Sequence, residues 1–170
     1  MKYTLQFLTV AFLLISCHKD NNKSQPGCDI QQVYADNAQK VSIPAGIWGT
    51  VSDMEGNCMP TVQPSTNTCK NCPVKRTVKI YQYTLITNAI RSGNSPIFFE
   101  SFNSPLIAQV DADESGFFQV NIPPGHYSMA VVENGKLYAN NSDGQGGLNP
   151  FTFTSGLQNI NIVMTYKAAF

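Results

Sequence analysis

The stretch D-A-D-E-S-G-F-F-Q-V-N-I-P-P-G-H-Y-S-M-A-V-V, residues 111–132, decides the fold class. In residues 118–122 every second side chain is apolar, which is the period-two pattern of a strand with one buried face. Pro124 and Gly125 then suit the central positions of a type II turn, in which glycine supplies a positive φ. A second alternation begins at Tyr127. The stretch therefore predicts a β-hairpin whose two strands lie side by side.

Short apolar or alternating runs recur through the rest of the chain. Asn134-Gly135 favours a type I′ hairpin turn, and residues 53–57 (D-M-E-G-N) have the composition of another turn. Residues 28–40 are ambiguous between a short helical turn and an irregular segment. Many short strands without a long amphipathic helix predict an all-β sandwich. The expected strands are residues 47–51, 74–85, 97–100, 106–110, 118–122, 127–133, 136–140, 151–154 and 160–164.

Two polar loops interrupt this pattern. Residues 58–73 (C-M-P-T-V-Q-P-S-T-N-T-C-K-N-C-P) form a long loop with three cysteines, and residues 141–147 (N-S-D-G-Q-G-G) read as a flexible loop. Long loops without regular structure are usually functional or cross-linked. We therefore expect any distinctive activity to lie in these two loops.

The N-terminus predicts export and a lipid anchor. Lys2 precedes an apolar run at residues 5–15, which is too short to span a bilayer and fits a signal segment. Leu14-Ile15-Ser16-Cys17 resembles the bacterial lipobox, which implies removal of residues 1–16 and acylation of Cys17. Two or more acyl chains on one residue give stable membrane attachment.

The remaining chain divides into an anchored tether with a lead-in, residues 17–42, and one domain, residues 43–170. Residues 18–27 are polar and carry too little apolar surface to fold. Lys19-Asp20 resembles the surface-export signals of some outer-membrane lipoproteins, and an ordinary linker explains it equally well, so periplasmic and surface-facing locations both stay open. The formal net charge is zero. Without a basic patch, a nucleic-acid partner has no electrostatic support.

Two stretches carry a family resemblance. Residues 49–60 (G-T-V-S-D-M-E-G-N-C-M-P) and 113–131 (D-E-S-G-F-F-Q-V-N-I-P-P-G-H-Y-S-M-A-V) resemble the carboxypeptidase regulatory-like domain. The resemblance implies a prealbumin-like (transthyretin-like) antiparallel β-sandwich and a non-catalytic accessory or binding role, often at cell surfaces. It is specific for fold and weak for function, since function resides in sites grafted onto folds.

Four cysteines remain once Cys17 is acylated: Cys28, Cys58, Cys69 and Cys72. In an exported protein an even number favours two disulfides, with three possible connectivities. Cys69 and Cys72 also form a C-x-x-C, which could serve thiol-disulfide exchange or metal binding. A redox C-x-x-C normally begins a helix, and a four-cysteine zinc site normally has a second C-x-x-C, so structural disulfides are favoured.

Asp111, Asp113 and Ser115 resemble the start of an EF-hand calcium loop, D-x-D-x-S-G. The twelfth position of such a loop should be a bidentate glutamate, and here it is Ile122 in a predicted strand. A turn between strands is therefore the better interpretation, and these three residues are only weak metal candidates.

The remaining side chains argue against catalysis. His126 is the one histidine outside the anchor region, where His18 lies, so layouts with several histidines are excluded. No G-x-S-x-G elbow accompanies it. The aromatic residues favour core packing over a ligand surface; they are Trp48, Tyr81, Tyr83, Phe98 and Phe99.

We therefore expect an outer-membrane lipoprotein whose β-sandwich is a non-catalytic binding or assembly module. Its expected partners are the membrane, through the lipid anchor, and an unknown envelope protein or glycan, with no cofactor. The alternative is an envelope thiol-disulfide or metal-binding protein that uses Cys69 and Cys72.

Overall fold

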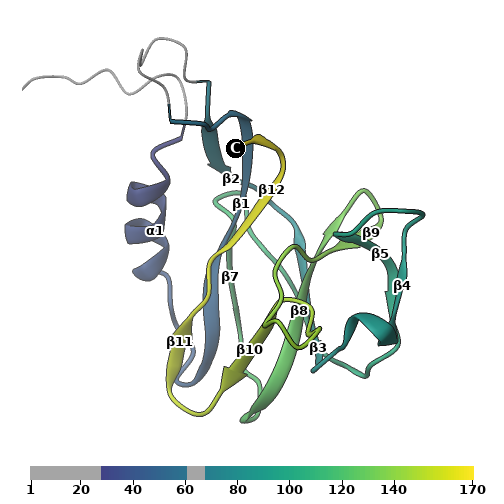
Figure 1. Cartoon of the computed structure of the whole chain (residues 1–170). Coiled ribbons are helices and arrows are strands. Elements are labelled where there is room, and N and C mark those ends of the chain that lie inside the picture. Colours follow the sequence, from purple (N-terminus) through teal and green to yellow (C-terminus); the bar gives the residue numbers. More distant parts are fainter. Residues whose placement is uncertain (1–27, 61–67) are drawn as a thin grey trace, which may run out of the picture.

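The computed structural model describes residues 28–60 and 68–170, so the predicted signal segment, Cys17 and the first part of the tether lie outside the described residues. Two sheets pack against each other (Figure 1), which confirms the all-β sandwich. Among the described residues, no helix is both long and apolar enough to cross a membrane. The first sheet contains β1 (Gly46–Asn57), β2 (Lys70–Pro73), β7 (Phe117–Val120), β11 (Leu157–Asn159) and β12 (Ile162–Ala169).

The second sheet has the strand order β4-β5-β9-β8-β3-β6, with β10 paired to β8. At the β8–β9 connection, Asn134 and Gly135 both have positive φ, 51° and 76°, which confirms the expected type I′ turn. The strands of the second sheet are β3 (Thr77–Gln82), β4 (Ala89–Arg91), β5 (Phe98–Phe102), β6 (Leu106–Asp111), β8 (Gly125–Glu133), β9 (Lys136–Tyr138) and β10 (Pro150–Phe153).

Residues 111–132 do not form the predicted hairpin. Its first strand, β7, pairs with β1 in the first sheet, whereas its second strand, β8, pairs with β3, β9 and β10 in the second sheet. Pro123 and Pro124 have no N–H to donate to a ladder, so the chain leaves one sheet and enters the other. Gly125 does not have a positive φ, so the predicted type II turn is also wrong. The Tyr127 hydroxyl donates to the Pro123 carbonyl at 2.7 Å and holds this corner.

β1 is the central strand of the first sheet. It is antiparallel to β7 and β2 and parallel to β11 and β12, so this sheet is mixed rather than purely antiparallel. The predicted turn at residues 53–57 is wrong, because these residues continue β1 between β2 and β12. β2 also gives regular structure to the end of the predicted 58–73 loop. In both places, strand pairing overrides the local turn composition.

β11 and β12 both pair with β1, one after the other, in the same register. Gly46 pairs with Leu157 and Val51 pairs with Ile162, which is the same offset. Between the two strands, the Asn161 Oδ1 atom accepts a hydrogen bond from the Thr50 N–H at 3.0 Å and so replaces a backbone acceptor.

The main core lies between the sheets, and a second cluster covers the outer face of the second sheet. β8 contributes to both, because Met129 and Val131 face the first sheet while Ala130 lies in the second cluster. The segment with the 3₁₀ turn η2 (Ile86–Asn88) helps to cover that outer cluster. Val78 and Ile80, which share one face of β3, are both fully buried.

The ambiguous residues 28–40 contain helix α1 (Ile30–Ala38), which lies beside the first sheet (Figure 1). The Asp29 carboxylate caps its N-terminus by accepting from the N–H groups of Gln31 and Gln32 at 3.1 Å. Asn37, near its end, is fully buried against β1.

Candidate functional site

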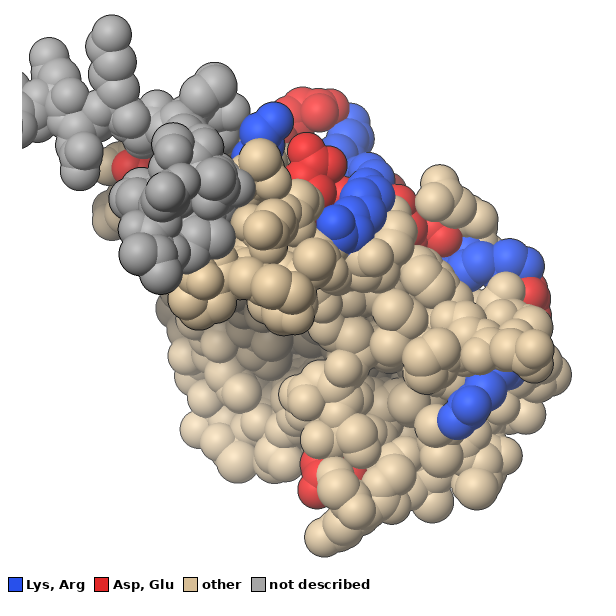
Figure 2. Space-filling model, turned by 45° about the horizontal axis from the view of Figure 1, so that its top comes forward, with Lys and Arg blue, Asp and Glu red and all other residues tan. Residues whose placement is uncertain are grey.

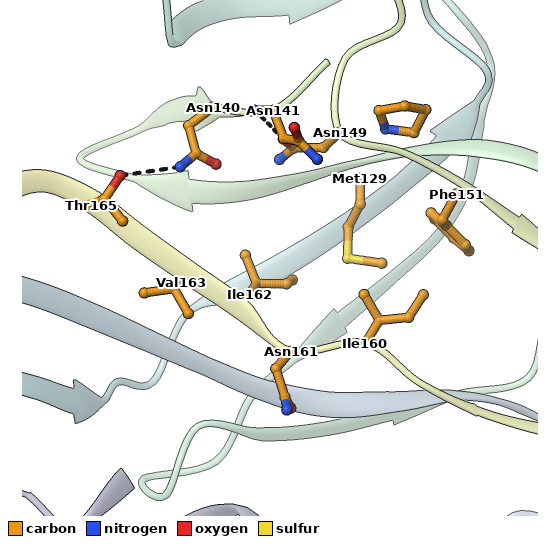
Figure 3. Close-up of a pocket in the computed structure, with 11 residues that line it drawn as sticks. Met129, Asn140, Asn141, Asn149, Phe151, Ile160, Asn161, Ile162, Val163 and Thr165 are labelled. Atoms are coloured by element: carbon orange, nitrogen blue, oxygen red, sulfur yellow. Dashed lines mark hydrogen bonds between the residues drawn. The ribbon is translucent and has the colours of Figure 1, made fainter. Parts of the chain in front are cut away.

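A cleft of about 380 Å³ lies between β12 of the first sheet and β8 and β10 of the second (Figure 3). Its volume is within the range of small-ligand sites. The lining combines polar amides with apolar side chains and contains no charged residue. It consists of Met129, Asn140, Asn141, Asn149, Pro150, Phe151, Ile160, Asn161, Ile162, Val163 and Thr165.

Three asparagines form one wall of the cleft, and their side chains are fixed by hydrogen bonds. The Asn140 Nδ2 group donates to Thr165 Oγ1 at 3.2 Å, and the Asn149 Oδ1 atom accepts from the Asn141 N–H at 2.7 Å. Asn149 holds this position with φ = 40°, a left-handed conformation that asparagine tolerates better than most residues. Within the described chain, the Nδ2 groups of Asn141 and Asn149 and the Asn140 Oδ1 atom have no hydrogen-bond partner. Two donors and one acceptor are therefore available to a ligand.

The floor of the cleft is apolar. Met129 and Ile162 belong to the buried core, and Phe151 and Ile160 are half-buried beside it (Figure 3). The Phe151 ring packs against Tyr127, with the ring centroids 5.6 Å apart. Because these side chains are anchored in the core, the floor is preformed.

The loop at residues 141–147, predicted to be flexible, carries several hydrogen bonds next to the amide wall. The Asp143 carboxylate accepts from the Tyr83 hydroxyl at 2.7 Å and from the N–H groups of Gln145 and Gly147 at 2.8 and 3.0 Å. These hydrogen bonds keep the pKa of Asp143 below its ordinary value, and the bond from Tyr83 has the largest effect. The Gly146 carbonyl also accepts from the Ile86 N–H at 2.7 Å. These contacts tie the loop between Asn141 and Asn149 to Tyr83 and Ile86.

Charged side chains lie elsewhere. On the face shown in Figure 2 they gather along one border, and most of the remaining surface is uncharged. Several form exposed ion pairs, among them Lys75–Glu114 at 2.9 Å and Lys40–Asp113 at 3.0 Å. This segregation leaves the cleft electrically neutral.

A partly buried charge network joins the two sheets. Glu133, which is 3% exposed, is paired with Arg76 and accepts from the Tyr166 hydroxyl at 2.6 Å. Burial alone would raise the pKa of Glu133, but these hydrogen bonds outweigh it and the pKa is lowered. Next to it, Lys167 is paired with Asp53, and the hydrogen bond raises the pKa of Lys167. Every charge is paired, so the network has the character of a structural link.

The four cysteines form two disulfides, as expected, and the structure settles their connectivity. Cys28 is bonded to Cys72, and Cys58 is bonded to Cys69. The two cysteines of the C-x-x-C are thus in different bridges. The first bridge joins the segment before α1 to β2, and the second closes the 58–69 loop.

The weak calcium candidates are engaged in a turn. The Asp113 Oδ1 atom accepts from the Ser115 and Phe117 N–H groups at 2.8 and 3.0 Å, and Oδ2 is paired with Lys40. Burial raises the pKa of Asp113, yet these bonds lower it overall. Asp111 accepts instead from the Thr77 hydroxyl at 2.6 Å. Across residues 28–60 and 68–170, no group of three or more His, Cys, Asp or Glu side chains is arranged to hold a metal ion.

His126 and the aromatic candidates lie outside the cleft lining. His126 is exposed and stacked on Tyr83, with the ring centroids 4.1 Å apart. Phe99 and Tyr81 are buried, and Phe98 packs on Tyr138 and Tyr166. Trp48 is half-buried. Phe99, Tyr81 and Phe98 thus agree with core packing, whereas Trp48 and Tyr83 belong to neither of the two hydrophobic clusters.

Sequence reasoning missed most of the cleft. Of its polar residues, only Asn141 lies in a loop that the sequence indicated as a candidate for function. No such indication came from the sequence for the other four, which are Asn140, Asn149, Asn161 and Thr165. The available signal was the density of asparagine in residues 140–161 with almost no charge, since Asp143 is the one charged residue there. Comparison of the chain with protein-family models, curated proteins and solved structures gives no match.

Proposed function

We propose that this chain is a lipid-anchored envelope protein whose β-sandwich is a non-catalytic binding module, with the asparagine-lined cleft as its ligand site. In this proposal Cys17 carries the acyl chains, and the domain is of the carboxypeptidase regulatory-like, prealbumin-like type in the outer membrane. Two disulfides support a location outside the cytoplasm, because such bridges persist in oxidising compartments.

The observation that carries the binding role is the chemistry of the cleft. Fixed amide groups above a preformed apolar floor give orientation and affinity to a neutral ligand. Catalysis by general acids and bases needs a titratable side chain within reach of the substrate, and none of the described residues lining the cleft has one. The redox and metal alternatives are less favoured, because Cys69 and Cys72 are occupied in separate bridges.

Photocrosslinking in intact cells tests the proposal. The photoreactive residue p-benzoylphenylalanine would replace Asn141 at the rim and, as a control, the exposed Gln109 on β6. We expect a discrete adduct with an envelope component from position 141 only. Equal adducts from both positions, or none from position 141 in a folded, membrane-bound protein, would contradict a binding site in the cleft.

The non-catalytic part needs a separate measurement. The captured component would be purified and incubated with the full-length protein, and its mass followed over time. An unchanged mass is expected, and a new product that depends on the protein would show that the module is an enzyme.

A further inference from the structure

We infer that the cleft binds an uncharged peptide segment in extended conformation, which adds as a strand to the free edge of β12. This inference rests on the proposed binding role of the cleft and names its ligand class. Four features carry it: the orientation of the β12 backbone, a stop at one end, the amide wall, and the absence of charge.

The β12 backbone presents unpaired groups to the cleft. The Ile160 N–H donates to the Trp48 carbonyl of β1 at 2.8 Å, whereas the Thr165 N–H points the other way and donates to the Tyr138 hydroxyl at 2.9 Å. Backbone groups alternate in direction along a strand. The N–H and C=O of Val163, two residues before Thr165, therefore point away from β1. Among the described strands β12 pairs only with β1, so these groups are unpaired.

The same edge is closed at its far end. The Tyr138 hydroxyl accepts the hydrogen bond of the Thr165 N–H, and the Tyr138 side chain is itself fully buried. An added strand can thus pair with Val163 but cannot continue past Thr165. The site accepts a short segment and fixes where it ends, unlike an open sheet edge that would pair with any strand.

The amide wall faces this edge across the cleft (Figure 3) and matches the second side of an added strand. A peptide offers N–H and C=O groups on both of its edges. The Val163 backbone can hydrogen-bond to one edge of the peptide. The other edge can hydrogen-bond to the amide wall, through the free Nδ2 groups of Asn141 and Asn149 and the Asn140 Oδ1 atom. Every second side chain of the peptide would then contact the floor formed by Met129, Phe151 and Ile162 and its neighbours.

The uncharged lining of the cleft restricts the bound peptide to uncharged side chains. A charged peptide side chain in this cleft would lose its hydration without an ionic partner, which is costly. Edge strand β6 also exposes apolar side chains, Leu106 at 49% and Ile107 at 40%, but none of its residues lines the cleft. The β12 cleft is the edge that has a second polar wall and a floor.

Selection from a phage-displayed random heptapeptide library on the full-length protein provides the probe. We expect enrichment of uncharged peptides with alternating apolar residues, and the best one would be synthesised for titration calorimetry. Val163→Pro removes the outward N–H, which the β1 ladder does not use, and proline is tolerated at such edge positions. We expect this variant to bind about tenfold more weakly, the cost of leaving one peptide carbonyl without its donor in the cleft.

The matched control is Val163→Ala, which shortens the same side chain but keeps the N–H, and it should bind at least about threefold more tightly than Val163→Pro. Equal binding by the two variants would overturn the inference. Should Val163→Pro fail to fold, peptides N-methylated at single positions replace it. Loss of binding confined to the few positions whose N–H faces Val163 or Asn140 supports strand addition, and an equal effect at every position refutes it.

The outcome also separates the two proposals. A glycan adduct at position 141 in cells, with no peptide enriched in the selection, would retain the binding module and refute the peptide ligand. No adduct together with no enriched peptide would refute both.

Discussion

Asn37 shows how one polar side chain joins three segments. Its Nδ2 group donates to the Thr50 hydroxyl at 2.9 Å and to the Ser115 carbonyl at 3.0 Å, while its Oδ1 atom accepts from the Ser115 hydroxyl at 2.7 Å. The side chain is fully buried. Because every polar atom has a partner, the amide fixes α1 on the first sheet without a net desolvation penalty.

Replacing Asn37 by alanine should therefore destabilise the domain. Three hydrogen bonds would be lost and the buried Thr50 hydroxyl would be left without its partner, which we expect to lower the free energy of unfolding by about 2–3 kcal/mol. Urea unfolding followed by circular dichroism measures this. Gln32→Ala, on the exposed side of α1, is the control and should change stability by less than about 0.5 kcal/mol. Similar values for both variants would mean that the buried amide is not a structural link.

Glu133 makes stability depend on pH with a defined sign. Its pKa in the folded protein is lowered from the ordinary value of 4.5, despite burial, by Arg76 and Tyr166. A lowered folded pKa gives stability that is present above about pH 4.5 and is lost as the pH falls through the folded pKa. Glu133→Gln should therefore be less stable than wild type near neutral pH, and the difference should shrink on acidification.

Urea unfolding between about pH 6 and about pH 3 measures that difference. The comparison variant is Glu114→Gln, whose native side chain is 84% exposed, and it should differ little from wild type at any pH in this range. A gap between wild type and Glu133→Gln that does not depend on pH would disprove the linkage.

At the scale of elements, β1 depends on a close approach of two backbones. A Cβ atom at Gly49 would lie 1.8 Å from the Ile160 carbonyl oxygen, where β11 passes into β12. Backbone cannot move aside as a flexible side chain can. Glycine is needed here for space rather than for a positive φ, since its φ is not in the left-handed region.

Gly49→Ala should consequently lower the free energy of unfolding by about 3 kcal/mol or more, through overpacking. Gly93→Ala is the control, because Gly93 has φ = 57° but open space around it. Its cost should be only about 1 kcal/mol, the left-handed penalty of a non-glycine residue. If calorimetric melting gave the reverse order, the proposed close packing of β1 against Ile160 would be wrong.

The two disulfides stabilise different elements and should differ in strength. Cys28–Cys72 closes a separation of 44 residues and Cys58–Cys69 one of 11. Loop-closure entropy then predicts losses of roughly 4 and roughly 3 kcal/mol when each pair is replaced by serine. Urea unfolding of the two double variants, with intact-mass analysis to confirm the remaining bridge, measures the order. A larger loss for the shorter loop would show that native contacts outweigh the chain entropy.

For the whole molecule, membrane attachment and folding are expected to be independent. The described domain has its own core, cross-links and charge network, and none of these involves Cys17. Cys17→Ala should move the protein from the membrane fraction to the soluble fraction, while its melting temperature changes by less than about 2 °C. Mass spectrometry of the wild-type membrane form should show acyl chains on Cys17. An unacylated Cys17 in that form would refute the anchor.

Sequence patterns alone were enough to predict the all-β class, the buried faces of the strands, the Asn134-Gly135 turn and the presence of two disulfides. Each of these follows from local chemistry: alternation with period two, a dipeptide that accepts positive φ, and an even number of cysteines in a chain predicted to be exported. The lipid anchor at Cys17 stays a prediction of the same kind.

The pairing of the strands and the position of the cleft became apparent only in the folded protein. Period-two alternation shows that β7 and β8 are strands but is the same for a hairpin and for a crossing between sheets, so the Pro123-Pro124 corner was misread. The cleft joins Asn140 and Asn149 to β12, and its free edge depends on β12 having β1 as its one partner strand among the described residues. Pairing between distant segments is a property of the whole chain and has no local signature.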